Sequence, residues 1–440
     1  MKFWRRCSSL SAFLITGVGL ISVTTLVNLP APAAPAFDVA SAVAEAMPTV
    51  SATYRAIHQH PELGLQEFVT HALLQRELQA LGLAQFETLP QLPTAIVAVW
   101  DSGRPGPTIA LRAELDARPT QEAAGHDPRS AIDGIMHNCG HDAHAAMVLG
   151  AARIIMRHPN AFTGRIVFLF QPAEEIAGGA DDIVADGVLQ RLGVQAVFAQ
   201  HVSPNLPTGV ISFTRGAVLA GSNYFTITLQ GPGSHAAVPF EGADLPLVTA
   251  KVVDALASLS ARRLDALNHP AVLSVTRIET GSSTALNILP STATIAGTIR
   301  AFADLDATDS PHRPSVRDIL TQTLDGLTSA YGATYDLTLR SGSPPTRNDT
   351  ALETALLPTL NLKWPGTLQV TTDRGMFSED FAYYTAAFPC LYFGLGVTRD
   401  GQTAGGVHTA DFAIDPAALA IGTRWLVELA QTASEKLPAR

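Results

Sequence analysis

The sequence is poor in cysteine, in charge and in long apolar runs. Only three of its 440 residues are cysteine, too few for the disulfide framework of a small secreted scaffold. Charged residues make up 15% of the chain, against about 25% in a typical globular protein. Because 47% of the residues are hydrophobic, a large packed core is expected and a disordered chain is excluded.

The charge that is present is mostly negative. The formal net charge is −10, since 39 Asp and Glu outnumber 29 Lys and Arg. Such a chain is not expected to bind nucleic acid or an anionic membrane surface. A small anionic substrate would therefore need a local positive group. The length of 440 residues suits two domains, at about 100–200 residues each.

The N-terminal segment has the composition of an export signal. Basic residues come first, an apolar run follows at residues 10–29, and small residues then lead to Ala36. We expect cleavage after Ala36 or, nearly as well, after Ala33, and hence a periplasmic or secreted protein. An uncleaved anchor helix is the alternative, since the run approaches the ~20 residues that span a bilayer. The Arg5-Arg6 pair leaves twin-arginine export open. No other stretch is long and apolar enough to span.

Apolar periodicity predicts alternating helices and strands in the first half of the chain. Helices are expected at residues 44–81 (two, with a turn near Pro61), 144–157 and 181–192. Strands are expected at residues 95–100, 108–111, 165–170 and 194–199. The first two strands are joined by a short connection and are predicted to be neighbours. Strands alternating with helices are typical of an α/β domain with a largely parallel sheet.

The pattern changes near Gly216. Strands are predicted at residues 223–230, 271–279, 292–302 and 334–340, with helices at 245–263 and 316–331. This strand-helix-strand-strand-helix-strand order is typical of a ferredoxin-like domain. Strands at residues 367–371 and 390–394 and a closing helix at 416–435 then complete the first domain. We therefore predict a signal peptide at 1–36, a catalytic domain formed by 37–216 and 343–440, and an inserted domain at 217–342.

The densest chemistry lies between Met136 and His144, where one thiol, three imidazoles and a carboxylate occur in nine residues. Thiolate and imidazole ligands suit Zn, Mn, Co or Ni far better than Mg or Ca. Cys139 is expected to be a free thiol, and Cys390 with it. A disulfide between them would remove the thiolate that can bind a metal.

Further candidate ligands follow predicted strands. Glu174 and Glu175 come directly after the strand at 165–170, His201 ends the next strand, and His408 lies in a glycine-containing loop. Open α/β sheets bind ligands at the carboxyl ends of their strands. An isolated Glu-Glu pair is usually solvated surface. After a buried strand, one glutamate can ligate a metal while the other acts on water as a general base.

Taken together, these segments resemble the M20 metallopeptidase/amidohydrolase family. The matching branch contains hippurate hydrolases, N-acyl-amino-acid amidohydrolases and plant auxin-conjugate hydrolases. The motifs run in family order over nearly the whole chain after the signal. They are Ile57-His-Gln-His-Pro-Glu-Leu63, Leu111-Arg-Ala-Glu-Leu-Asp-Ala117, Met136-His-Asn-Cys-Gly-His-Asp-Ala-His144, Phe170-Gln-Pro-Ala-Glu-Glu175, Gln200-His-Val202, Gly233-Ser-His-Ala-Ala-Val-Pro239, Asn287-Ile-Leu-Pro290, Gly297-Thr-Ile-Arg300 and Ser378-Glu-Asp-Phe381.

The resemblance implies an α/β catalytic domain of the metal-dependent exopeptidase type, with an inserted ferredoxin-like α+β dimerisation or lid domain. It also implies a general base and acid at Glu174 and two divalent metal ions (Mn, Zn, Co or Ni). The implied metal ligands are Cys139, His141, Glu175, His201 and His408. His137, Asp142 and His144 would then orient the loop and the ligands.

In the inserted domain, His235 matches a histidine that, in dimeric relatives, reaches the partner's site and stabilises the developing oxyanion. Asn287 and Arg300 match positions that hold the substrate's carboxylate, a task that suits the planar guanidinium. The chain departs from the family pattern at Glu114, where Asp is usual, and at Arg118, where an apolar residue is usual. Thr409-Ala410 replaces the more common Ser-Pro after the last ligand.

The resulting expectation is an amidohydrolase that cleaves small-molecule N-acyl amino acids. Its partners would be the substrate and a second copy through the inserted domain, with no nucleic acid and no membrane after signal cleavage. An exported dipeptidase or carboxypeptidase of the same family is the alternative. A non-catalytic metal- or ligand-binding protein is the third, and it would be favoured only if Glu174 or a ligand were missing.

Overall fold

The computed structural model describes residues 37–439 except residues 283, 309–312, 400–401 and 403–404. The signal predicted at residues 1–36 lies outside the described residues. Among the helices that are described, none combines the length and the apolar composition needed to cross a membrane.

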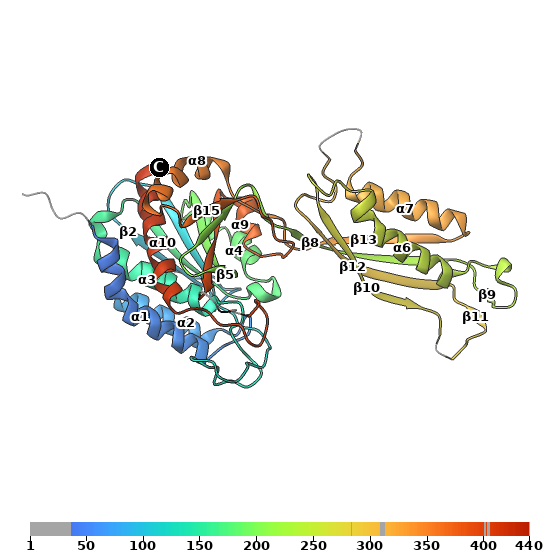
Figure 1. Ribbon diagram of the computed structural model, residues 1–440, viewed down its shortest axis with the longest axis horizontal. Helices are drawn as coiled ribbons and strands as arrows, with labels where there is room; N and C mark the ends of the chain where they lie inside the picture. Colours follow the sequence, from blue (N-terminus) through green and yellow to red (C-terminus); the bar gives the residue numbers. More distant parts are fainter. Residues whose placement is uncertain (1–36, 283, 309–312, 400–401, 403–404, 440) are drawn as a thin grey trace, which may run out of the picture. The chain divides into compact units, whose positions relative to one another are not determined.

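The main body is built on an eight-stranded mixed sheet (Figure 1). In sheet order its strands are β1 (Gln85–Glu87), β2 (Ile96–Asp101), β4 (Arg165–Gln171), β3 (Thr108–Glu114), β5 (Ala196–Pro207), β16 (Cys390–Thr398), β6 (Ile211–Thr214) and β15 (Leu368–Thr371). Its helices are α1 (Val39–Gln59), α2 (Phe68–Ala80), α3 (His141–Arg157), α4 (Ala180–Asp186), α5 (Val188–Arg191), α8 (Thr350–Lys363), α9 (Ala382–Ala387) and α10 (Ala417–Lys436). The central strands β4, β3, β5 and β16 are parallel, as predicted for this domain.

Both faces of the central strands are covered. Val167 and Leu169 of β4 pack in one core with Ile183 of α4 and Tyr384 of α9. The alternate residues of β4 are also fully buried, and helices α1, α3 and α10 pack against one another and against the sheet. A parallel sheet covered on both faces accounts for the continuous apolar runs in its strands.

The inserted domain has the predicted ferredoxin-like order. Its strands are β8 (Gly221–Gln230), β10 (Ala271–Thr280), β12 (Thr292–Ala301) and β13 (Thr334–Ser341), and its helices are α6 (Leu245–Arg262) and α7 (Val316–Ala330). The sheet order is β10-β12-β8-β13 with every pair antiparallel. A capping box between Ser315 and Asp318 begins α7. Alternate residues of β8 pack with α6 and α7 in one core. Phe225 of β8, Leu256 of α6 and Leu324 of α7 all belong to it.

Three local predictions are wrong. Strands β2 and β3 are not neighbours, because β4 lies between them and pairs antiparallel with β2. The 102–107 connection crosses the start of β4, where Gly164 N donates to Arg104 O at 3.1 Å. Strand β5 continues to Pro207 along β16, so His201 lies within the strand rather than after it. The helix predicted at 181–192 is interrupted at Gly187, whose φ is +77°.

Several elements were not predicted. They are the helices α8 and α9, the strands β1 and β6, the pair β9 (Ser234–His235) and β11 (Ile288–Leu289), the pair β7 (Ala217–Leu219) and β14 (Thr346–Arg347), and the 3-10 helices η1 (Pro159–Ala161), η2 (Glu174–Ile176) and η3 (Pro239–Glu241). Two-residue and three-residue strands are too short for periodicity to reveal. Strands β7 and β14 pair where the chain leaves and re-enters the main body.

Candidate active site

Cys139 and His141 flank Gly140 at the start of α3. Gly140 has φ +86°, in the left-handed region that favours glycine. A Cβ added there would lie 2.5 Å from Cγ2 of Val202, so the space also requires glycine. This turn directs the side chains of Cys139, in the loop, and His141, in the first turn of α3, toward the same space. Both side chains are buried.

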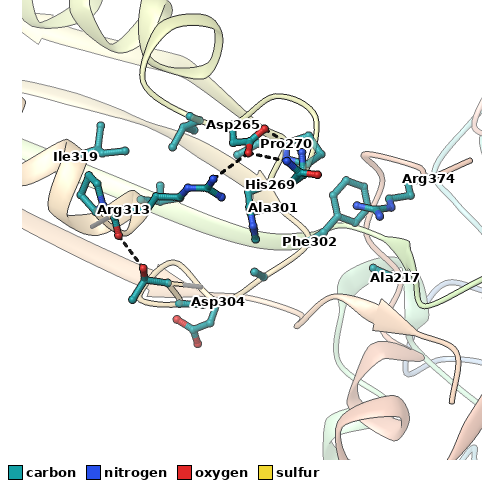
Figure 2. A pocket seen from close by; sticks show the side chains of 18 of the residues that line it. Ala217, Asp265, His269, Pro270, Ala301, Phe302, Asp304, Arg313, Ile319 and Arg374 are labelled. Carbon is teal, nitrogen blue, oxygen red and sulfur yellow. Dashed lines mark hydrogen bonds and ion pairs between the residues drawn. The ribbon is translucent and has the colours of Figure 1, made fainter. Parts of the chain in front are cut away.

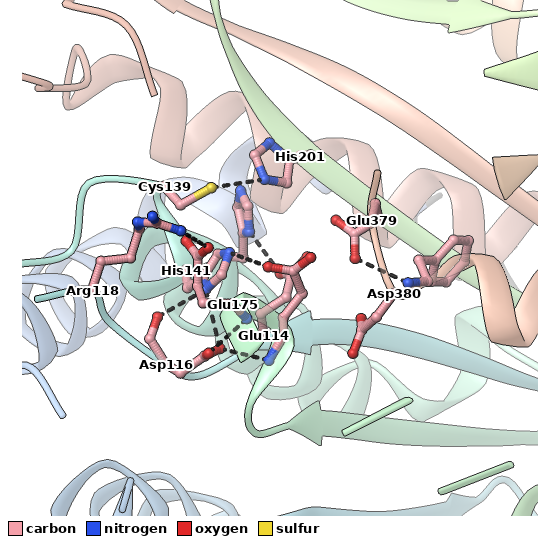
Figure 3. Close-up of polar contacts among 12 residues, drawn as sticks. Glu114, Asp116, Arg118, Cys139, His141, Glu175, His201, Glu379 and Asp380 are labelled. Carbon is pink, nitrogen blue, oxygen red and sulfur yellow. Dashed lines mark hydrogen bonds and ion pairs between the residues drawn. The ribbon is translucent and has the colours of Figure 1, made fainter. Parts of the chain in front are cut away.

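His201 faces Cys139 from strand β5 (Figure 3). Its Nδ1 lies 2.8 Å from the carbonyl oxygen of Val202, to which it donates, and its Nε2 lies 3.5 Å from the Sγ of Cys139. Burial, followed by repulsion from His144, lowers the pKa of His201 to about 4. A neutral ring with a protonated Nδ1 presents the lone pair of Nε2, which is the tautomer a metal ligand needs.

His141 has the same arrangement. Its Nδ1 lies 2.8 Å from the carbonyl oxygen of Asp116. Its Nε2 is buried without a hydrogen-bond partner among the described residues, and it lies 3.9 Å from Oε2 of Glu174. Leaving such a nitrogen unpaired costs about 1–3 kcal/mol. A cation bound at Nε2 would remove this cost.

Glu174 and Glu175 follow β4 in an elbow with an unusual backbone. Ala173 and Ala177 on either side have φ values of +61° and +53°, which non-glycine residues adopt only when the surroundings enforce it. The carboxylate of Asp116 enforces it here. It accepts the backbone N–H of Glu174 at 3.1 Å and that of Glu175 at 2.9 Å. The two side chains are therefore placed by hydrogen bonds to their own backbone.

His408 reaches the cluster from the C-terminal loop. Its φ is +70°, and its backbone N–H donates to the carbonyl oxygen of Asn138 at 2.7 Å. Its Nε2 lies 3.4 Å from Oε1 of Glu175. Ligand atoms of Cys139, Glu175 and His408 all lie within 4.8 Å of one another. A loop far along the chain is thus tied to the loop that carries the cysteine.

These donors fit a pair of divalent cations. One group joins Cys139, Glu175 and His408, and a second joins Glu175 to His141 and Glu174. The Oε1 atom of Glu175, like Nε2 of His141, is buried without a hydrogen-bond partner among the described residues. A soft thiolate with imidazoles and a carboxylate is the donor set that borderline divalent metals prefer. These two groups contain four of the five predicted ligands, and the fifth, His201, lies beside them with its Nε2 3.5 Å from the Sγ of Cys139.

Another cluster of ligand-type atoms contains a histidine whose two ring nitrogens are already hydrogen-bonded. Glu114, His141, His144 and His201 also offer atoms within 4.8 Å of one another. However, Nδ1 of His144 lies 2.7 Å from Glu114, and its Nε2 accepts the backbone N–H of Val202 at 3.0 Å. With both nitrogens engaged, His144 orients its neighbours, consistent with the supporting position expected for it.

The two elbow glutamates differ in their proton affinity. Burial raises the pKa of Glu174 well above its usual range, and the nearby Glu379 and Asp380 raise it further. Burial also acts to raise the pKa of Glu175, but His408, whose Nε2 lies 3.4 Å from Oε1, and other positive groups lower it to about 2. One carboxylate is thus an ionised ligand, and its neighbour is suited to hold a proton.

Arg112 balances part of this negative charge from behind the site. Its side chain is fully buried, and its Nη2 lies 2.9 Å from Glu379 and 2.7 Å from Asp380. Nη1 donates to Glu114, and Nε donates to Gln171 at 2.9 Å. Buried charges require such partners. The network connects β3, the end of β4 and the 379–380 segment, and so supports the elbow that follows Gln171.

Asp142 lies outside the ligand cluster. Its Oδ2 is 2.6 Å from Nδ1 of His58, whose Nε2 is 2.9 Å from Oε1 of Glu122. Burial acts to lower the pKa of His58, but the two carboxylates raise it to about 9. His137 is buried, and neither of its ring nitrogens has a hydrogen-bond partner among the described residues. Asp142 thus supports the loop through a charged imidazole.

Three supporting residues had no role assigned from sequence. Asp116 positions both elbow amides, His58 joins two carboxylates, and Glu67 accepts the N–H of Ala173 at 2.9 Å. For two of them the sequence held a signal, because Asp116 and His58 lie within motifs shared with the family. Asp116 also follows β3 by two residues, at the edge where ligands bind.

The two departures near the site have different surroundings. Glu114 is enclosed by Arg112 and His144 and faces no open space. Arg118 is partly exposed, with 31% of its side-chain surface accessible, and its Nη1 donates to Oε2 of Glu175. The guanidinium of Arg118 therefore hydrogen-bonds to Oε2 of Glu175, whereas Oε1 is the oxygen that faces His408.

The residues predicted in the inserted domain are not gathered in this cluster. His235 and Asn287 are exposed, and they lie on the paired segments around β9 and β11. The Nδ1 atom of His235 accepts the N–H of Ala237 at 3.1 Å. Arg300, half-buried on β12, donates from Nη1 to the hydroxyl of Ser378, next to Glu379. Only Arg300 is thereby linked to the site's surroundings by a hydrogen bond.

Comparison with known proteins gives a consistent result. The profile of Peptidase family M20/M25/M40 matches residues 110–432. N-acetylcysteine deacetylase from Bacillus subtilis is 33% identical over 379 residues, which cover 86% of this chain and 94% of the relative. Thermostable carboxypeptidase 2 from Saccharolobus solfataricus is 32% identical over 374 residues, covering 84% and 91%.

A solved structure has the same architecture. The YXEP protein of Bacillus subtilis, described as a dinuclear metal binding peptidase from the M20 family, superposes with a TM-score of 0.75 at 29% identity. The match covers 90% of this chain and 100% of that one. The inserted domain is therefore part of the shared architecture.

Proposed function

The chain belongs to peptidase family M20/M25/M40, and from this membership and the convergent donors we propose that it hydrolyses N-acyl amino acids. The products are a free amino acid and a carboxylic acid. The observation that carries the proposal is the elbow, where Glu174 lies beside the ligand-type atoms of Glu175 and His141. A relative named as an N-acetylcysteine deacetylase acts on a substrate of this class.

Cys139, His141, Glu175, His201 and His408 would hold two divalent cations, taken from Mn, Zn, Co and Ni. When bound, such ions would polarise the scissile carbonyl and lower the pKa of the attacking water toward about 7. The protein's own part is to direct the donor atoms at the cluster. The backbone carbonyls of Val202 and Asp116 do this by engaging Nδ1 of His201 and His141, so that Nε2 of each ring faces the cluster.

Glu174 carries the proton. Its backbone is held by Asp116, and burial together with Glu379 and Asp380 gives its carboxylate a raised pKa. A carboxylate of this kind can accept a proton from the attacking water and return it to the leaving amine. Its position in the elbow keeps it next to the cluster throughout.

The inserted domain would supply the contacts to substrate. Arg300 and Asn287 are assigned to the free carboxylate of the amino acid, for which a guanidinium offers paired donors. His235 is assigned to the developing oxyanion, reached from a second copy of the chain in a homodimer. Its exposure in a single chain supports a group that acts on another subunit.

A carboxypeptidase or dipeptidase is the second candidate, favoured by the similarity to thermostable carboxypeptidase 2. The two activities share a free carboxylate on the substrate and differ on the acyl side. A non-catalytic binding protein is disfavoured, because the base and every ligand position are present and gathered together.

The deciding experiment is a substrate panel with added Mn, Zn, Co or Ni. It contains N-acetyl, N-benzoyl and indole-acyl amino acids, each paired with its carboxamide, together with dipeptides and N-blocked peptides. The proposal expects turnover of N-acyl amino acids and little turnover of the carboxamides. Faster cleavage of peptides would favour the carboxypeptidase, and no turnover by metal-loaded protein would refute both.

We also propose that the chain is exported. The support is the basic, apolar and small-residue order of the N-terminal segment. N-terminal sequencing of protein recovered from its native host should begin at Phe37 or at Ala34. Recovery of uncleaved protein from the cytosolic fraction would contradict export, and uncleaved protein in the membrane would indicate the anchor.

A further inference from the structure

A pocket lined by several arginines lies away from the ligand cluster. Its volume is about 380 Å³. Part of its lining comes from the inserted domain and part from the segments around β7 and β14 (Figure 2). None of the nine predicted site residues lines it. We call it the arginine pocket, after Arg215, Arg263, Arg313, Arg347 and Arg374.

The lining has an excess of positive charge. Five arginines and two carboxylates, Asp265 and Asp304, line the pocket. Arg215 is also paired with Glu353 at 3.1 Å, so an excess of two positive charges is left in a chain whose formal net charge is −10. Arg313 is paired with Asp265 at 3.2 Å, and Figure 2 shows this pair on the wall formed by the inserted domain. Positive charge gathered in a concave surface attracts anions.

Three of these arginines have no carboxylate partner among the described residues, and one of the three, Arg263, donates to the side-chain oxygen of Gln322 at 3.3 Å. Arg347 donates from Nη2 to the backbone carbonyl of Phe302. The guanidinium carbon of Arg374 lies 5.4 Å from the centre of the Phe302 ring. Partial burial, followed by repulsion from Arg374, lowers the pKa of Arg347. Both guanidiniums therefore lie against Phe302, and a bound anion would relieve the repulsion between them.

We propose that the arginine pocket binds a phosphate group. Guanidiniums form paired hydrogen bonds to phosphate and carboxylate oxygens. In the pocket they come from separate segments, at 215, 263, 313, 347 and 374. A tetrahedral oxyanion presents oxygens in several directions and so suits donors from several walls. A planar carboxylate suits one or two.

The test is calorimetric titration of the metal-loaded protein with inorganic phosphate at constant ionic strength. Phosphate could also bind at the metal ligands, so the same titration is made on Glu175→Gln. The pocket is removed by Arg347→Gln/Arg374→Gln. The single variant Arg374→Gln removes no hydrogen bond within the part of the chain that the structure describes, and so guards against misfolding. A matched control, Arg76→Gln/Arg191→Gln, removes two exposed charges elsewhere.

The expected result is a phosphate isotherm that persists in Glu175→Gln and in the control. In the double pocket variant Kd should rise at least about tenfold, the effect of losing roughly one charged hydrogen bond. Arg374→Gln should give a smaller rise in the same direction. Binding lost in Glu175→Gln and kept in the pocket variants would overturn the proposal. So would no binding, or equal binding of malonate, which would show a site for any dianion.

Discussion

The ligand cluster of the main body and the candidate substrate contacts of the inserted domain are organised in opposite ways. In the main body, His141 is buried and His201 is partly buried, and each is oriented by a backbone carbonyl. In the inserted domain, His235 and Asn287 are exposed on short paired segments. The chemistry is thus pre-organised by one sheet, whereas the substrate contacts need a further component, the substrate or a second subunit.

The first prediction addresses the pre-organised side and has the largest expected effect. Glu174→Gln keeps the size and the backbone position of the side chain but cannot accept the proton. We expect kcat to fall by about 10²–10⁴-fold, with bound metal unchanged by elemental analysis. Unchanged turnover in metal-loaded protein would remove Glu174 from the mechanism.

The second prediction addresses the exposed side. His235→Ala should lower kcat by about 10²–10³-fold, the usual effect of losing one donor to an oxyanion, with a smaller change in KM. The measurement is steady-state kinetics on the preferred N-acyl amino acid. A full kcat in the variant would show that the inserted domain does not take part in the chemical step.

Mixing the two variants tests whether His235 acts across subunits. If it does, a mixed dimer of Glu174→Gln and His235→Ala contains one intact site. After subunit exchange at equal amounts, about a quarter of the wild-type activity should return, because half of the two-fold dimers are mixed. Recovery that stays at the level of the separate variants would contradict action on the partner.

The third prediction concerns the support behind the cluster. His58 has a pKa of about 9 in the folded protein against an ordinary value of 6.5. Its contribution to stability is complete below pH 6.5 and is lost as pH rises through 9. Relative to His58→Gln, wild-type stability should fall by about 3 kcal/mol across that window. Urea unfolding from pH 6 to pH 9.5 measures this, and a pH-independent difference would contradict the charged imidazole.

The fourth prediction has the smallest expected effect. Arg300→Ala should lower kcat/KM by about 10–100-fold for substrates with a free carboxylate, the loss of one charged hydrogen bond with its geometry. The matching carboxamides should be little affected. Arg340→Ala is a control on strand β13 of the same sheet, where Arg340 stacks on Tyr224. An equal effect of Arg300→Ala on both substrate series would exclude the carboxylate contact.

The prediction of the fold succeeded where the signal was local. The ferredoxin-like order was read from strands and helices that differ from their predicted bounds by one or two residues, as at β8 and α7. The pairing of β2 with β4 was not predicted. The short connection between β2 and β3 suggested that these two strands are neighbours, and it does not indicate that β4, which comes later in the chain, lies between them. Gly187 interrupts a helix by its φ of +77°, a feature that apolar periodicity does not contain.

The candidate site likewise contains features that the sequence predicts and features that it does not. Residue chemistry and motif order identified Cys139, His141, Glu175, His201 and His408, because thiol, imidazole and carboxylate are properties of the residues themselves. The role of Asp116 was missed, because accepting two amide hydrogen bonds depends on where the elbow lies. Motif matching marked the residue without showing what it holds.

The sequence alone determined the ligand types, the order of the elements and the family, since all three depend on residue identity and local spacing. Only the tertiary structure decided that Nε2 of His141 faces the cluster, since its Nδ1 is engaged by the carbonyl of Asp116 from another segment. It also decided that arginines at positions 215 to 374 share one pocket. Both results depend on contacts between segments that are far apart in the chain, whose geometry arises only when the chain packs.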